Sequence, residues 1–182
     1  VLENNIYVDG IIEITPAHNV AVTSIKPSKT ILGVGYTMTI DVTVLNKGTF
    51  NEAFNVILYA DINVTVIGDE IIIGNKTVPF LANATSIIRT FSWDSSGAAK
   101  GAYTLTVEVT QVLGETDVTD NTLIDGTVLV TTAGDVNGDR KVDIKDIYAI
   151  ILVFNSKPGQ PKWNPVYDIN NDLKVDIKDI YI

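Results

Sequence analysis

Oxygen-bearing side chains recur at a fixed spacing in two stretches near the C-terminus. A twelve-residue pattern begins at Asp135 and returns 33 residues later at Asp168. Positions 1, 3, 5, 9 and 12 of the two copies are Asp135, Asn137, Asp139, Asp143 and Asp146, then Asp168, Asn170, Asp172, Asp176 and Asp179. Ca²⁺ takes about 6–8 oxygen ligands at roughly 2.3–2.6 Å, and a tight turn presents this spacing to one ion. The repeat therefore predicts two calcium-binding loops.

The remaining positions complete each predicted ligand shell. Position 7 offers a backbone carbonyl, here from Lys141 and Lys174, and position 9 reaches the ion through water. Position 12 lies on the first turn of the helix that leaves the loop. The alternative is a pair of solvated acidic turns, but both copies continue as Val-Asp-Ile-Lys-Asp-Ile-Tyr, which argues against chance.

A helix is predicted directly after the first loop, over residues 143–154. One apolar stripe at helical spacing contains Ile144, Ile147, Ile150, Ile151 and Phe154. Ser156, Pro158 and Gly159 should end this helix. The sequence stops three residues after Asp179, so we expect the second loop to lack its exiting helix. Either further residues of this protein or another chain would then cover part of the stripe.

The duplicated loop and helix resemble a type I dockerin, a small calcium-folded module that binds a cohesin domain. The resemblance covers residues 134–182. It rests on the Gly-Asp-Val-Asn-Gly-Asp opening, on Asp at position 12, and on a linker with Pro158, Pro161, Trp163 and Pro165. It implies two Ca²⁺ ions and a cohesin-like protein partner.

Positions 6, 10 and 11 of the loops depart from the dockerin pattern. Position 6, often Gly because the turn needs a positive φ, is Arg140 in the first loop and Leu173 in the second, which predicts local strain. Dockerins usually carry a Ser/Thr recognition pair at positions 10 and 11, which here are Ile-Lys in both loops. The candidate partner contacts in this region are Ile144, Lys145, Tyr148, Ile177, Lys178 and Tyr181.

Residues 17–132 carry the pattern of an immunoglobulin-like β-sandwich. Val, Ile and Thr dominate, and apolar residues alternate in runs such as Tyr36–Val44 and Tyr103–Val109. Turn signals separate the runs, for example Asn46-Lys-Gly and Asp94-Ser-Ser-Gly. About seven strands at this spacing predict a sandwich.

The same region resembles the CARDB family of cell-adhesion-related domains from prokaryotic surface proteins, over most of residues 17–131. The resemblance rests on His18-Asn-Val-Ala-Val, on Ile40-Asp-Val-Thr-Val-Leu-Asn-Lys-Gly and on Gly101-Ala-Tyr-Thr-Leu-Thr-Val. It also includes Gly114-Glu-Thr-Asp-Val-Thr-Asp-Asn. The resemblance implies adhesion or structural spacing, and not catalysis.

An internal repeat links the N-terminus to the last strand of the predicted sandwich. Residues 4–15 match residues 120–131, with identical residues at four of the aligned positions. We therefore expect residues 1–16 to resemble the last strand of a preceding or neighbouring sandwich. The strand would complete a tandem module, be donated to another subunit, or form an extra edge strand on its own domain. Its apolar face is Ile6, Val8, Gly10, Ile12 and Ile14.

Composition narrows the function class. Residues 1–134 carry 14 acidic and 6 basic side chains, and residues 135–182 carry 8 and 7. An acidic chain argues against nucleic acid. It contains no Cys, one His and no apolar run of about 18 residues, so we expect neither catalysis nor a membrane span. Three glycosylation triplets, at Asn63, Asn75 and Asn83, favour a glycosylated surface protein.

The sequence thus predicts a mainly β chain with three parts: residues 1–16, a sandwich over 17–132 and a dockerin-like calcium module over 133–182. We expect a non-enzymatic extracellular protein that assembles at a cell surface, as an array or a strand-linked filament. One alternative is a docking module for a cohesin-like scaffold. Another is a carbohydrate-binding sandwich that uses Trp93 and Trp163.

Overall fold

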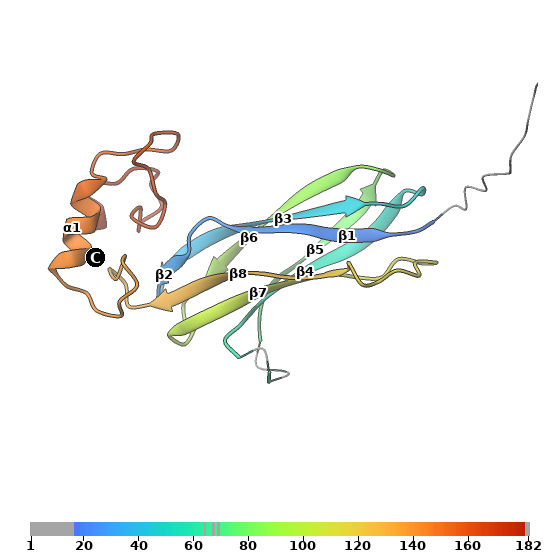
Figure 1. The fold of residues 1–182 in the computed structure, drawn as a ribbon, viewed down its shortest axis with the longest axis horizontal. Helices are drawn as coiled ribbons and strands as arrows, with labels where there is room; N and C mark the ends of the chain where they lie inside the picture. Colours follow the sequence, from blue (N-terminus) through green and yellow to red (C-terminus); the bar gives the residue numbers. More distant parts are fainter. Residues whose placement is uncertain (1–16, 64, 67, 69, 181–182) are drawn as a thin grey trace, which may run out of the picture.

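The computed structural model describes residues 17–180 except 64, 67 and 69. Within this range eight strands form two sheets, and residues 133–180, called here the C-terminal module, lie at one end of the sandwich (Figure 1). One sheet has the order β1-β3-β6 and the other has the order β2-β8-β7-β4-β5. The strands are β1 (Val20–Pro27), β2 (Ile31–Gly33), β3 (Thr37–Asn46), β4 (Glu52–Asp61), β5 (Ile71–Leu81), β6 (Ser86–Asp94), β7 (Gly101–Val109) and β8 (Thr122–Thr131). The predicted β-sandwich with a small helical C-terminal part is confirmed.

The core lies between the two sheets because apolar residues alternate along the central strands. In β3, Ile40, Val42 and Val44 are fully buried, whereas Asp41 on the other face is exposed. This period of two puts every second side chain into the core. Each fully buried side chain of this size contributes roughly 1.5–3 kcal/mol to folding. The sandwich is therefore a stable support for the C-terminal module.

Trp93 belongs to this core and not to the surface. Its side chain is buried and meets Tyr103 edge-on, with 5.3 Å between the ring centroids. A buried ring cannot stack on a sugar, so the carbohydrate-binding alternative loses Trp93. Trp163 is half-buried and packs against the apolar core of the C-terminal module.

Strand β2 was missed by the sequence prediction, and it forms the end of the sandwich that meets the module. It runs parallel to the last residues of β8, with Ile31 opposite Leu129 and Gly33 opposite Thr131. A Cβ on Gly33 would lie 2.8 Å from the Cα of Ala133, so only glycine fits there. The chain therefore enters the C-terminal module against the end of β2.

Strand β8, the last strand of the sandwich, lies between β7 and β2. The repeat copy, residues 4–15, lies outside the described residues, as do Ile6, Val8, Gly10, Ile12 and Ile14. Because β8 fills its own position, the copy cannot take that place in the same sandwich. Where it goes stays a prediction.

The C-terminal module contains helix α1 (Ile144–Leu152) and the 3₁₀ turn η1 (Ile177–Asp179). Helix α1 lies within the predicted range and ends two residues earlier. Asn155 and Ser156 pair with Val175 through backbone bonds of 2.7 and 3.0 Å, which tie the end of the helix to the second loop. The small core of the module consists of Val136, Ile150, Ile169 and Val175.

The three glycosylation triplets lie on exposed asparagines. Asn63 and Asn83 are in turns, whereas Asn75 lies within β5. In the described part of the chain, no helix has the length and apolar character needed to cross a membrane.

Candidate calcium-binding loops

The position-12 carboxylate closes the first loop, which spans residues 135–146. Asp146 Oδ1 accepts hydrogen bonds from the amides of Val136 (3.0 Å) and Asn137 (3.3 Å). Its Oδ2 accepts from the amide of Asp143 at 2.9 Å, while the Asp143 side chain accepts from Lys145 N. This reciprocal capping box starts α1. Asp146 thus fastens the start of the helix to the start of the loop.

The second loop, residues 168–179, repeats this geometry. Asp179 Oδ1 accepts from Ile169 N (2.8 Å) and Asn170 N (3.3 Å), and its Oδ2 accepts from Asp176 N at 2.8 Å. Asp176 caps η1 as Asp143 caps α1. Two stretches separated by 33 residues therefore fold alike, because the same residue types stand at the same positions.

The position-1 carboxylates hold the middle of each turn. Asp135 Oδ2 accepts from Arg140 N at 2.9 Å, and Asp168 Oδ2 accepts from Leu173 N at 3.0 Å. Arg140 and Leu173 have φ angles of 70° and 65°, so position 6 takes the left-handed conformation that the sequence predicted. A side chain in this conformation costs roughly 1–2 kcal/mol.

The other predicted ligands lie at the rim of each loop. Asn137 and Asp139 use Oδ1 to accept from the amide two residues further on, and Asn170 does the same. Lys145 and Lys178 reach the carboxylates at position 5, with Nζ to Oδ2 distances of 3.4 and 3.2 Å. The carbonyl-bearing residues at position 7 are Lys141, which is exposed, and Lys174, which is half-buried.

Four carboxylates are buried at positions 1 and 12. Asp135, Asp146, Asp168 and Asp179 are each no more than 2% exposed. Burial raises the pKa of Asp168, and the nearby Asp179 charge adds to this, while bonds from backbone amides and the Lys29 charge act in the opposite direction. Buried carboxylates need compensation by hydrogen bonds or by positive charge.

The donor set fits calcium in its chemistry: each loop presents carboxylate, amide and carbonyl oxygens, with two carboxylates buried together. In the described residues, however, no three Asp, Glu, His or Cys side chains gather into a metal-binding cluster. The rim side chains bond to the backbone of their own loop, and among the predicted ligand side chains only those at positions 1 and 12 are buried. The ligand assignment therefore remains a prediction for all twelve positions.

The predicted partner contacts on the module are exposed. Ile144 on α1 is 73% exposed, and Tyr148 and Ile151 lie on the helix surface with it. In the second loop Ile177 and Lys178 are exposed, and Lys145 is the matching residue of the first. Tyr181 lies outside the described residues. The two Ile-Lys pairs thus stand on the surface at equivalent places, while Ile150 alone of the helical stripe is fully buried.

Family comparisons agree with this architecture. The family model described as CARDB matches residues 19–125, which is more than half of the chain. The chain belongs to the CARDB family. The model for the dockerin type I domain matches residues 133–182, directly after the CARDB domain. Both resemblances read from the sequence are therefore confirmed.

Solved structures similar to this chain include CARDB domains. A crystal structure of a Pyrococcus furiosus CARDB domain, described as in complex with di-metal ions, shares 21% identity, with a TM-score of 0.52. The match covers 66% of this chain and 99% of that domain, and it shows the fold alone. A solution structure from the same organism has 22% identity and a TM-score of 0.49, over 64% of this chain and 97% of that one. No curated protein matches the chain.

CARDB and dockerin domains are non-catalytic modules, and dockerins of this type bind calcium and a protein partner. The single histidine also has a structural role. His18 Nδ1 lies 2.6 Å from Glu52 Oε1, and the ring stacks on Phe50. These contacts hold the start of the CARDB domain to its β4 strand.

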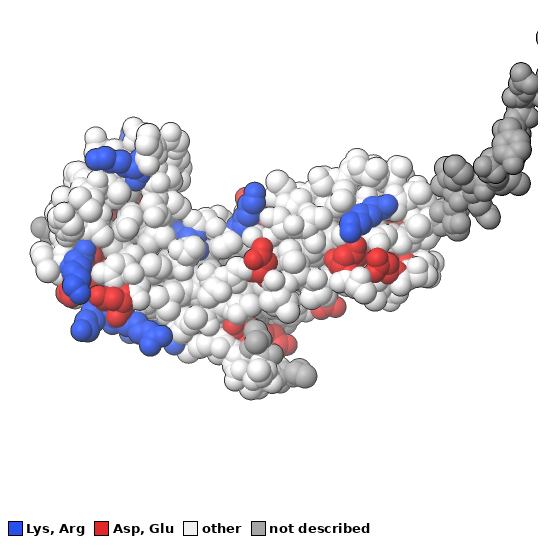
Figure 2. Space-filling view, in the orientation of Figure 1, with Lys and Arg blue, Asp and Glu red and all other residues white. Residues whose placement is uncertain are grey.

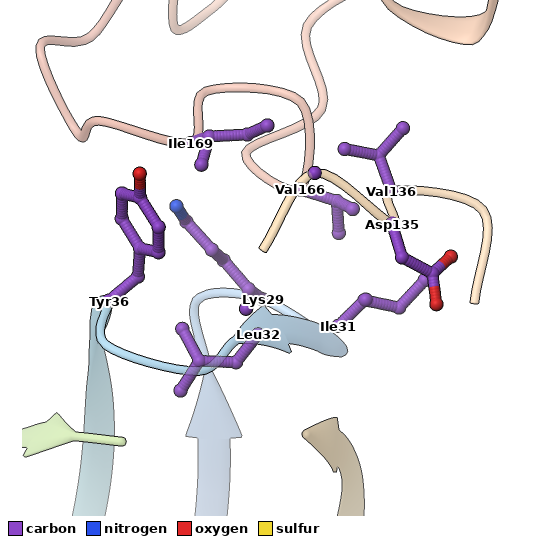
Figure 3. Close-up of a pocket in the computed structure, with 10 residues that line it drawn as sticks. Lys29, Ile31, Leu32, Tyr36, Asp135, Val136, Val166 and Ile169 are labelled. Carbon is purple, nitrogen blue, oxygen red and sulfur yellow. The ribbon is translucent and has the colours of Figure 1, made fainter. Parts of the chain in front are cut away.

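Two residues at the dockerin loops were missed by sequence reasoning. Thr131, the last residue of β8, donates its hydroxyl to Asp135 Oδ2 at 2.6 Å. Lys29, from the turn between β1 and β2, donates to the carbonyl oxygen of Asp168. A pocket between the two domains is lined by Lys29, Ile31, Tyr36, Asp135, Val166 and Ile169, among others (Figure 3). No local pattern around Lys29 marks it, because its partner lies 139 residues away.

Proposed function

We propose that this chain is a calcium-ordered docking module carried on a structural CARDB domain, and that it acts outside the cell or at its surface. The observation that carries the proposal is the pair of matched loops, each with two buried carboxylates. CARDB and dockerin domains are typical of extracellular or surface proteins, which supports the location.

Calcium would supply the positive charge that the buried carboxylates need. The residues that would hold it are Asp135, Asn137, Asp139, Lys141 through its carbonyl, Asp143 through water, and Asp146, with Asp168, Asn170, Asp172, Lys174, Asp176 and Asp179 in the second loop. Crowded acids repel one another without the ion, so binding is coupled to folding of the module. The C-terminal module has only a small apolar core to hold it otherwise.

The docking surface in this proposal is the exposed face of α1, formed by Ile144, Tyr148 and Ile151. These apolar side chains stand next to Lys145 on the outer surface of the module. Lys and Arg gather on this end of the molecule in the face that Figure 2 shows, whereas acidic groups are more frequent along the sandwich. The surface suits a protein partner with an apolar patch and acidic residues around it, such as a cohesin-like domain.

The test is complex formation between the full chain and a panel of cohesin domains, in millimolar calcium and in chelator. We expect the chain to bind a cohesin domain in calcium but not in chelator. The Ile151→Ser variant should lose this binding. Ile124→Ser is the matched control, since Ile124 is 62% exposed but lies on β8. Failure of calorimetry to detect calcium uptake would contradict the proposal, and so would equal weakening by both variants.

The second candidate function is assembly through strand complementation, as an array or a filament. Its support is the repeat of residues 4–15 in β8, together with the occupied position of β8. Strand donation from one copy to the next is head-to-tail and gives open chains. Light scattering tests it: long assemblies of the full chain should shorten to monomers when residues 1–16 are deleted, and an unchanged mass would exclude strand exchange.

A further inference from the structure

A lysine of the CARDB domain is buried against the second calcium loop. Lys29 is only 5% exposed, and its Nζ donates to the backbone carbonyl of Asp168 at 2.5 Å. Figure 3 shows the side chain rising from the β1–β2 turn, past Tyr36, toward Ile169. A lysine is rarely buried so fully unless an acidic partner compensates its charge.

The charges that act on Lys29 include the two buried carboxylates of that loop. Burial lowers the pKa of Lys29, and the charges of Asp168 and Asp179, at positions 1 and 12, act in the opposite direction. Because the ammonium of Lys29 bonds to the backbone of Asp168, it is held at the loop whose two buried acids calcium would bind. Its direct bond is to the carbonyl of Asp168, which leaves the carboxylate oxygens on the loop side.

The first loop meets the CARDB domain through neutral contacts. Thr131 donates a hydroxyl to Asp135, and Gly138 packs against Leu129 and Ile31, where a Cβ would lie 3.1–3.2 Å from their side chains. The two loops repeat each other internally but differ in what the CARDB domain presents to them: a hydroxyl and apolar groups to the first, and an ammonium to the second.

We propose that Lys29 is a built-in cation for the second loop, which supports Asp168 and Asp179 when calcium is absent and opposes calcium when it binds. This inference rests on the proposed calcium binding. Like charges at short range repel, so Ca²⁺ enters the second loop at a cost that the first loop does not have. The two loops then fill in order, the first at lower calcium concentration than the second.

The docking of the second loop does not depend on Lys29 alone. The side-chain amide of Asn171 donates to the carbonyl oxygen of Thr37 at 3.0 Å, and Tyr36 packs against the core of the module. These contacts remain when the charge of Lys29 is removed. Lys29→Met keeps the length of the aliphatic stem, so it isolates the effect of the ammonium.

The experiment is a calcium titration of the ¹⁵N-labelled full chain, followed by NMR at the amides of Gly138 and Asn171, which stand at position 4 of the two loops. In the unmutated chain Gly138 should respond at lower calcium than Asn171. In Lys29→Met the Asn171 midpoint should move to about tenfold lower calcium, with Gly138 changed by less than about twofold. Lys29→Arg, which retains the charge, and Lys26→Met, at an exposed position of β1, should behave like the unmutated chain.

The possible outcomes distinguish a failure of the proposed calcium binding from a failure of the role proposed for Lys29. Absence of any calcium response in the unmutated chain contradicts the proposed function and this inference together. A normal response that Lys29→Met leaves unchanged, shifts equally in both loops, or weakens at Asn171 contradicts the inference alone.

A second measurement needs no variant. In chelator, hydrogen exchange should be at least about tenfold slower at Leu173 N than at Arg140 N, because Lys29 still supports the second loop. These two amides make matching bonds, of 3.0 and 2.9 Å, to the position-1 carboxylate of their own loop. Equal rates, or faster exchange at Leu173, would overturn the proposal.

Discussion

Among the described residues, 23 buried apolar side chains form the core cluster of the CARDB domain, whereas four form that of the C-terminal module. The module instead buries four aspartates, which bond to the amides of its own turns. Apolar burial works without any ligand, but buried charge must be compensated. One chain thus combines a domain held together mainly by apolar burial with a module that buries charged groups, whose charge calcium would compensate in the proposed function.

The largest effect should come from removing the position-1 acids. In Asp135→Ala with Asp168→Ala, we expect residues 135–182 to lose their order while the CARDB domain keeps its fold, since each carboxylate holds the middle of its turn. NMR amide dispersion in millimolar calcium measures both parts at once. Asp125→Ala, on the exposed side of β8, is the control. If the module stays ordered in the double variant, its order does not depend on the position-1 carboxylates, and the proposed difference between the two regions is wrong.

A cavity in the sandwich should instead destabilise the CARDB domain and leave the calcium loops unaffected. Leu105 is fully buried between the sheets, so Leu105→Ala should lower the free energy of unfolding of the CARDB domain by about 2–5 kcal/mol. The calcium midpoint of the loops should stay the same. Denaturant unfolding and calcium titration of the same sample measure the two effects, and a parallel fall in calcium affinity would show that the two regions are not separate.

Two adjacent isoleucines on α1 allow a buried and an exposed position of the module to be compared. Ile150 is 2% exposed and Ile151 is 53% exposed. Ile150→Ala should cost the calcium-loaded module about 2–4 kcal/mol, because it leaves a cavity in a very small core. Ile151→Ala should change stability by less than about 0.5 kcal/mol. Thermal unfolding followed by NMR compares them, and similar losses would place Ile151 in the core as well.

The smallest effect should come from backbone strain. Leu173 has a positive φ and an exposed side chain, so Leu173→Gly should stabilise the loaded module by about 0.5–1 kcal/mol. Ile151→Gly, at a helical position, should instead cost about 1 kcal/mol. The calcium-loaded melting temperatures give both values. A loss of stability for Leu173→Gly would mean that its side chain makes a needed contact.

Local features of this chain could be predicted from the sequence, and contacts between distant segments could not. The left-handed conformation of Arg140 and Leu173 follows from their place in a twelve-residue turn, and α1 follows from its apolar period. The end of α1 was placed two residues late, since Val153 already forms the C-cap. Strand β2 is stabilised by its parallel pairing with β8. Because it is only three residues long, it shows no alternation of apolar residues that the sequence could reveal.

The burial of Lys29 is another contact between distant segments that could not be predicted from the sequence. A single lysine in a turn is usually solvated, and nothing near residue 29 distinguishes it from Lys26. Its environment exists only once the module has folded back against the end of the sandwich. The repeated twelve-residue pattern predicted two equivalent loops. The difference between the loops comes from the CARDB domain that lies against them.

The direct passage of β8 into the first loop has a mechanical consequence. Only residues 132–134 separate the end of β8 from Asp135, and β8 is bonded on both sides, to β7 and to β2. A pull on a docked partner would reach the sandwich along the axis of β8. The load would then act in shear across two rows of hydrogen bonds, which must break together, rather than peel them apart one by one. In the proposed docking function, the connection to the partner thus leaves from a strand that is paired on both sides.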